Sequence, residues 1–244
     1  MKRAIVYHAV CQKRYFKLAR RSARSAKNQM PNVDTVLITD LPGESQWFDE
    51  IVRIDPVELV AAHLPPLLHL PSYYGSGIYL DADSRVCGPL YDVFELVEGE
   101  RVDIALVHSS GRARNRTYPQ CGVPTAYPHW RSAFIAFQNR ARARAFFVAW
   151  GKTFHEHRER YGAQMAHEGP CFTDQLPMRV ALYYSDVTIA TLPAKYCLVP
   201  NGVVVRGTVR TIATNGNGEG LATEANQDAP HARLFVRGKS RRLD

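Results

Sequence analysis

The chain has 244 residues, of which 45% are hydrophobic and 22% charged, and its formal net charge is +8. This length suits one large α/β domain or two small ones, and it can bury a sizeable core. No apolar run reaches the roughly 18 residues that a membrane helix needs, and residues 1–7 have the pattern of a strand, so we expect no cleaved signal. The five cysteines contain no CxxC pair, which signals neither a zinc site nor a disulfide framework and favours a cytoplasmic location.

The positive charge suits an anionic partner, such as a nucleotide diphosphate, a nucleic acid or an anionic membrane face. It gathers near the start, in the middle and at the end of the chain. The three clusters are Arg20, Arg21, Arg24 and Lys27; Arg140, Arg142 and Arg144; and Arg237, Lys239, Arg241 and Arg242. The simplest interpretation of each cluster is a solvated helix face or tail.

Strand-like and helix-like segments alternate along most of the chain. We expect strands at residues 3–10, 33–40, 49–55, 77–81, 102–107, 132–138 and 186–191, with β-rich sequence at 202–213 and a last strand at 231–236. We expect helices at residues 12–29, 89–97, 140–161 and 173–184, and helix-like sequence from Pro56 that Pro65 and Pro66 interrupt. This alternation predicts an α/β fold, a single domain with a mostly parallel central sheet flanked by helices.

Two further segments have no periodic apolar face. Residues 109–128 combine Gly, Pro, Arg and Tyr and predict a long loop, which in compact domains is functional or disordered. Residues 214–230 are polar and rich in glycine, which predicts a flexible loop. We therefore expect the main domain to cover residues 1–213, and residues 231–244 to form a final strand and a basic tail.

The strongest local signal is the Asp81-Ala82-Asp83 element, which follows an apolar strand. Open α/β sheets bind ligands at the carboxyl ends of their strands. Alternate residues of an extended segment project to the same side, so Asp81 and Asp83 can reach one cation. Carboxylates with phosphate oxygens and water are the ligands that Mg²⁺ and Mn²⁺ prefer. The alternative is a solvated turn at the end of a strand.

Three blocks of sequence carry a family resemblance. They are residues 70–94 around the Asp-x-Asp element, residues 129–137 followed by a helix with Trp150 and by Asp174-Gln175, and residues 189–197. In order and spacing they resemble the glycogenin-like glycosyltransferases, which use nucleotide sugars. The resemblance implies one GT-A (Rossmann-like) domain and a transferase that retains the anomeric configuration of the sugar.

The resemblance also implies roles at the element after the fourth strand and at a later helix. Asp81 and Asp83 would bind Mn²⁺ or Mg²⁺ and, with Ala82, the sugar-nucleotide donor, a UDP-sugar by default. Asp174 and Gln175 would contact the donor sugar as catalytic residues. The alternative for Asp174 is a cap of the following helix.

At the end of the first strand, Tyr7, His8 and Ala9 would hold the base and ribose of the donor. A strand end beside the crevice of the sheet is a natural ligand position. The alternatives are that Tyr7 is a core aromatic and His8 a satisfied polar residue.

The chain also departs from the family pattern. Arg131-Ser132-Ala133 stands where the family has Asn-Ser-Gly, and Cys197 where it has Asn. The late metal-binding His has no clear match, so we consider His231 as a third ligand, and Arg206 and Arg210 as sources of positive charge instead.

Contacts to the acceptor are expected from residues in and around the long loop: Arg114, Arg116 and Trp130. Aromatic faces stack on sugar rings and arginines bind carboxylates or phosphates, so we expect a glycan or glycoconjugate acceptor. The alternative is that the arginines only keep the loop soluble. The basic tail, residues 237–242, could hold the chain at an anionic membrane.

Two other functions remain open. A haloacid-dehalogenase-like phosphatase would use Asp81 as nucleophile and Asp83 as general acid/base, but it favours Thr or Val where Arg85 stands. A basic nucleic-acid-binding module would fit the charge, yet no helix-turn-helix, RNP or zinc-finger signature occurs, so we expect no nucleic-acid partner.

Overall fold

The computed structural model describes residues 1–56, 66–109, 121–166, 174–199, 203–213, 226, 232–236 and 239–243. The strands of the main sheet are β1 (Lys2–His8), β2 (Asp34–Thr39), β3 (Glu50–Arg53), β4 (Tyr74–Leu80), β6 (Ile104–His108), β7 (Trp130–Gln138) and β8 (Ile189–Leu192). The helices are α1 (Lys13–Gln29), α2 (Tyr91–Glu98), α3 (Ala141–Ala166) and α4 (Gln175–Tyr183), with the short 3-10 turns η1 (Pro66–His69) and η2 (Ala194–Tyr196).

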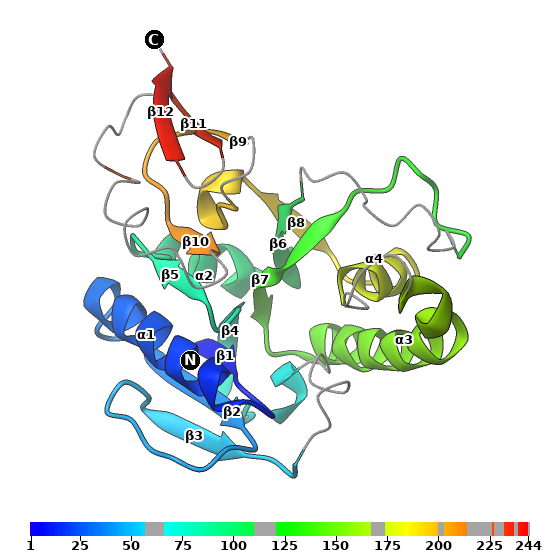
Figure 1. Cartoon of the computed structure of the whole chain (residues 1–244), viewed down its shortest axis with the longest axis horizontal. Coiled ribbons are helices and arrows are strands. Elements are labelled where there is room, and N and C mark those ends of the chain that lie inside the picture. Colours follow the sequence, from blue (N-terminus) through cyan, green and yellow to red (C-terminus); the bar gives the residue numbers. More distant parts are fainter. Residues whose placement is uncertain are drawn as a thin grey trace.

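Within the described residues, the main sheet has seven strands in the order β3-β2-β1-β4-β7-β6-β8. The pairs β3/β2, β2/β1, β1/β4 and β6/β8 are parallel, whereas β7 runs antiparallel to both β4 and β6. The prediction of a mostly parallel sheet flanked by helices is therefore confirmed (Figure 1). Because β7 is reversed, it begins at the edge where the parallel strands end, and this edge holds the candidate site.

Two hydrophobic cores cover the two faces of the sheet. On one face α1 contributes Ala19, Ala23 and Ala26, and α2 contributes Phe94. On the other face the aromatic side of α3, which includes Trp150, packs with residues of α4. The small residues of α1 let its backbone approach the sheet closely, and its polar side is left facing outward.

Two small sheets complete the fold. Strand β5 (Ser84–Val86), directly after the Asp-x-Asp element, pairs antiparallel with β10 (Thr211–Ala213). Strand β11 (Ala232–Val236) pairs with β9 (Val203–Arg206) and with β12 (Lys239–Leu243). Most of the expected basic tail is thus a strand, because hairpin pairing with β11 overrides a charged sequence of low strand propensity. The predicted flexible loop 214–230 lies outside the described residues except for Asn226.

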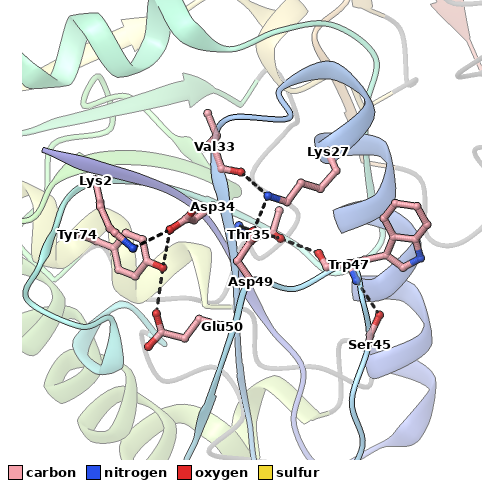
Figure 2. Close-up of polar contacts among 10 residues, drawn as sticks. All are labelled: Lys2, Lys27, Val33, Asp34, Thr35, Ser45, Trp47, Asp49, Glu50 and Tyr74. Carbon is pink, nitrogen blue, oxygen red and sulfur yellow. Dashed lines mark hydrogen bonds and ion pairs between the residues drawn. The ribbon is translucent and has the colours of Figure 1, made fainter.

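Polar side chains fasten α1 and β3 to the amino-terminal edge of the sheet, opposite the candidate site (Figure 2). The Asp49 carboxylate pairs with the Lys27 ammonium and accepts hydrogen bonds from the amide and hydroxyl of Thr35. The Thr35 hydroxyl shares its one proton between Asp49 and the Trp47 carbonyl oxygen, which lies 2.6 Å away. Burial raises the pKa of Asp49, but Lys27 and Thr35 more than offset it and hold the pKa below its ordinary value.

At the same edge, the first residues of four strands meet. The Tyr74 hydroxyl lies 3.1 Å from Asp34 Oδ2 and 3.0 Å from Glu50 Oε2, and Lys2 pairs with Asp34 at 3.4 Å (Figure 2). Burial, then Glu50 and Asp34, raise the pKa of Tyr74. These contacts align the four strands at their starts. In the described part of the chain, no helix is both long and apolar enough to cross a bilayer.

Candidate active site at the carboxyl end of β4

The Asp81–Asp83 segment lies where β4 ends against β7. The Asp81 amide donates to the Ala133 carbonyl of β7 at 3.1 Å, and the Ser84 amide donates back to the Asp81 carbonyl at 2.9 Å. The second bond closes a turn, so the two carboxylates are held on a short rigid segment between β4 and β5. Both Asp81 and Asp83 are half-buried.

Asp81 is surrounded by negative charge. Its Oδ1 accepts a hydrogen bond from the Tyr79 hydroxyl at 3.0 Å. Burial, then the nearby charges of Asp174 and Asp83, raise the pKa of Asp81 to about 7, and the Tyr79 hydrogen bond opposes that rise. Asp174 comes from a different element, the start of α4, so the fold brings a carboxylate that is distant in the sequence to the Asp81 and Asp83 pair. Such a cluster favours a proton or a cation.

Asp174 stands at the position before α4 but does not cap it. Its backbone is already helical, with φ −72° and ψ −19°, and its side chain makes no capping hydrogen bond. Instead, Asp174 Oδ1 accepts a hydrogen bond from Ser132 Oγ of β7 at 3.0 Å, and its carbonyl accepts one from the Trp150 indole at 3.0 Å. The carboxylate is therefore positioned toward the site by β7 and α3, and the capping alternative does not describe it.

Arg131 and Cys197, the two departures from the family pattern, lie beside the same segment. Cys197 is buried, and burial raises the pKa of its thiol to about 12. Arg131 opposes this rise, whereas Asp81 and Asp83 add to it, so all three charges are close to the thiol. Arg131 Nε is buried and has no hydrogen-bond partner among the described residues. The site thus contains a guanidinium beside its carboxylates.

The end of β1 contributes differently from what its sequence suggests. The Tyr7 side chain is 0% exposed; its ring packs edge-on against Phe48 and its hydroxyl accepts from Ser22 Oγ at 3.3 Å. The core-aromatic alternative therefore describes this side chain, and it has no surface for contact with a nucleotide. Ala9 is also buried, with its amide bonded to the Ile38 carbonyl, whereas His8 is half-buried at the strand end. The expected contact with a donor therefore stays a prediction for the His8 side chain and for the backbone only.

Of the expected acceptor residues, Trp130 lies in the described part of the chain. Trp130, the first residue of β7, is 5% exposed and packs edge-on against Tyr127 with ring centroids 5.2 Å apart. Its side chain is therefore packed inside the protein and offers little surface for stacking on a sugar. The candidates Arg114, Arg116 and His231 lie outside the described residues. Gln175, the first residue of α4, is half-buried next to Asp174.

Within the described ranges, no group of three or more His, Cys, Asp or Glu side chains has the arrangement of a complete metal site. Asp81 and Asp83 fit a divalent cation as two hard oxygen ligands, and the raised pKa of Asp81 reflects the negative charge that gathers beside it. The remaining positions would fall to the oxygens of a bound phosphate and to water.

The sequence assigns no role at the site to three residues that support it in the structure: Tyr79, Ser132 and Trp150. Tyr79 could have been found, because it lies two residues before Asp81 and so points to the same side of the strand. Ser132 and Trp150 act on Asp174 across separations of 42 and 24 residues. No local pattern encodes such contacts.

The comparisons with known proteins concern the fold. No family model and no curated protein matches the chain. Among solved structures, it resembles the galactosyltransferase LgtC in complex with donor and acceptor sugar analogues, with a TM-score of 0.63, 16% identity and 88% of each chain covered. It also resembles an active-site mutant of LgtC, with a TM-score of 0.61, 13% identity and coverage of 91% of this chain and 94% of the other. The fold is that of the GT-A glycosyltransferases.

Proposed function

We propose that the chain is a glycosyltransferase that moves a sugar from a nucleotide-sugar donor, by default a UDP-sugar, to a glycan or glycoconjugate acceptor. The observation that carries the proposal is the meeting of Asp81, Asp83 and Asp174 at the carboxyl end of β4. The likeness in fold to LgtC, which was studied with donor and acceptor sugar analogues, supports the same class of reaction. Neither named neighbour supports the phosphatase or the nucleic-acid alternative.

Asp81 and Asp83 would hold Mn²⁺ or Mg²⁺, with His231 as a candidate third ligand. When bound, the metal would neutralise charge on the departing diphosphate. The raised pKa of Asp81 supports this assignment, because a cation would relieve the repulsion among the three carboxylates. Arg131 supplies a second positive charge close to the same segment.

Asp174 and Gln175 would contact the donor sugar from the start of α4. The hydrogen bonds from Ser132 and Trp150 keep Asp174 in place before a donor arrives, so little reorganisation is needed on binding. A glutamine belongs to the active site of LgtC, since the mutant named above replaces one by glutamate. This supports a role for an amide side chain such as Gln175.

The proposed transfer can either invert or retain the anomeric configuration of the sugar. Inverting transfer needs a general base beside the acceptor hydroxyl. We propose retention, which the resemblance of the three sequence blocks to the glycogenin-like transferases implies, with the leaving diphosphate assisting on the front face of the donor. NMR of the freshly formed product decides between the outcomes, and an inverted anomeric configuration would contradict retention.

The decisive experiment is calorimetric binding of UDP and GDP with and without Mn²⁺. Asp81→Asn and Asp83→Asn should each abolish the Mn²⁺-dependent part of binding. The control is Asp186→Asn, which changes an exposed carboxylate outside the site and should bind like the wild type. If both site variants keep the wild-type affinity in Mn²⁺, Asp81 and Asp83 do not form the donor site.

A further inference from the structure

The net charge of the chain is concentrated on one helix. Helix α1 contains seven of the 31 Lys and Arg residues and none of the 23 Asp and Glu residues. Since the whole chain has a net charge of +8, the remainder carries only +1. The excess positive charge is therefore a property of α1 and not of the molecule in general.

Six of the seven cations are exposed, and they share one side of the helix. They are Lys13, Arg14, Lys17, Arg20, Arg21 and Arg24. At 100° per residue these six positions fall within an arc of about 120°, opposite the buried alanines that pack on the sheet. Among the described residues none of the six is in an ion pair, whereas the seventh, Lys27, pairs with Asp49.

This arrangement is unfavourable for the isolated helix. Lys13 and Lys17, Lys17 and Arg21, and Arg20 and Arg24 are like charges four residues apart, which repel. The first turn is basic, where the helix dipole favours acidic residues. A face that only needed to be solvated would be more stable with both signs of charge. An anionic partner removes this repulsion.

We infer that the exposed face of α1 docks on a lipid bilayer that contains anionic headgroups. A planar layer of headgroups can reach all six cations of a convex helix face at once. Two aromatic residues adjoin the arginines: Arg14 stacks over Tyr15 with 4.8 Å from the guanidinium carbon to the ring centroid, and Arg24 over Trp47 with 5.5 Å. Both aromatics are half-buried. Basic residues flanked by Tyr and Trp are typical of surfaces that lie in the membrane interface.

Helix α1 is also fixed relative to the candidate active site. The Ser25 hydroxyl oxygen accepts a hydrogen bond from the Val86 amide of β5 at 3.0 Å. Strand β5 begins directly after Asp83, and α1 itself begins five residues after the end of β1. Docking through α1 would therefore hold the Asp81–Asp83 edge at a constant position relative to the bilayer.

The test is co-sedimentation of the full chain with vesicles of phosphatidylcholine alone or mixed with phosphatidylglycerol. Wild type should bind only the mixed vesicles, and high salt should release it. Each basic residue near an anionic surface contributes roughly fivefold to partitioning, so Arg20→Gln/Arg21→Gln/Arg24→Gln should weaken binding roughly a hundredfold. The matched control is Arg101→Gln/Arg140→Gln/Lys152→Gln, which removes the same charge from exposed positions elsewhere and should change binding less than about threefold.

Several results would overturn the inference. The control variant could weaken binding as much as the α1 variant does. The wild type could bind both kinds of vesicle equally, or it could bind duplex DNA more tightly than the mixed vesicles at the same salt. Loss of binding in Lys239→Gln/Arg241→Gln/Arg242→Gln, with the α1 variant unaffected, would assign the contact to β12 instead. Circular dichroism checks that each variant is folded; should the triple α1 variant unfold, Lys17→Gln and Arg21→Gln are each expected to weaken binding about fivefold.

Discussion

Replacing Asp81 by Asn should stabilise the metal-free protein at alkaline pH and leave its stability nearly unchanged at acidic pH. The reason is the raised pKa of Asp81, about 7 in the folded chain against an ordinary value of 3.8. Below about pH 4 both the folded and the unfolded chains keep the proton, so the carboxyl group costs nothing. Between about pH 4 and pH 7 the unfolded chain loses the proton first, and stability falls as pH rises.

The size of the effect follows from the shift. At about 1.4 kcal/mol per pH unit, a shift from 3.8 to about 7 corresponds to an upper limit of about 4 kcal/mol. Because Asp81 is partly exposed, solvent screens its repulsion by Asp83 and Asp174, and we expect about half of this limit. Asn keeps the size of the side chain and can still accept the hydrogen bond from Tyr79.

Urea unfolding followed by tryptophan fluorescence, in a chelating buffer at pH 4 and pH 8, measures the difference. The free energy of unfolding of Asp81→Asn should exceed that of wild type by about 2 kcal/mol at pH 8 and equal it at pH 4. Adding Mn²⁺ with UDP at pH 8 should reverse the order, since only the wild type gains binding energy. The exposed control Asp186→Asn should follow the wild type throughout. An equal loss of stability at both pH values would refute the reasoning.

Three other substitutions test the supports of the site and the sheet. Ser132→Ala removes the hydrogen bond to Asp174 and should lower kcat about tenfold, with folding unchanged in circular dichroism. Thr35→Val removes a buried hydroxyl that donates its one proton to the Trp47 carbonyl and to Asp49, and it should lower the free energy of unfolding in urea by about 1–3 kcal/mol. Gly77→Ala places a methyl carbon 2.5 Å from the Phe137 ring and should cost about 1–3 kcal/mol by the same measurement, which Phe137→Leu should partly restore; additive losses would contradict this contact.

Local patterns in the sequence predict most of the main sheet. Apolar runs locate β1, β2 and β4, and the helix at residues 12–29 is found because its alanines recur at helical spacing opposite the cations. The carboxylates at the end of β4 are predictable for the same reason, since a strand end in a parallel sheet is where ligands bind. These features depend on residues that are close in sequence.

The rest of the fold and of the candidate site depends on contacts between segments that are distant in the sequence. The apolar sequence of β7 predicts a strand, but not that it enters antiparallel between β4 and β6. That insertion brings Ser132 to Asp174, a contact across 42 residues. Strand β5 has three residues and exists because β10 pairs with it. Tyr7 shows a further limit of the sequence. A residue at a strand end can point into the core, and the sequence of one strand does not say which face of the sheet a helix covers.

The distribution of charge changes what the basic composition implies. On sequence alone, a net charge of +8 suits an anionic nucleotide, but seven of the positive charges belong to α1, six of them on its outer face. The candidate site instead combines three carboxylates with the guanidinium of Arg131. A nucleoside diphosphate is itself anionic, so a site of this composition repels it until a further cation arrives. The proposed Mn²⁺ or Mg²⁺ and the donor would therefore bind together. The basic composition of the chain thus indicates an anionic partner for α1, and it carries no information about the donor.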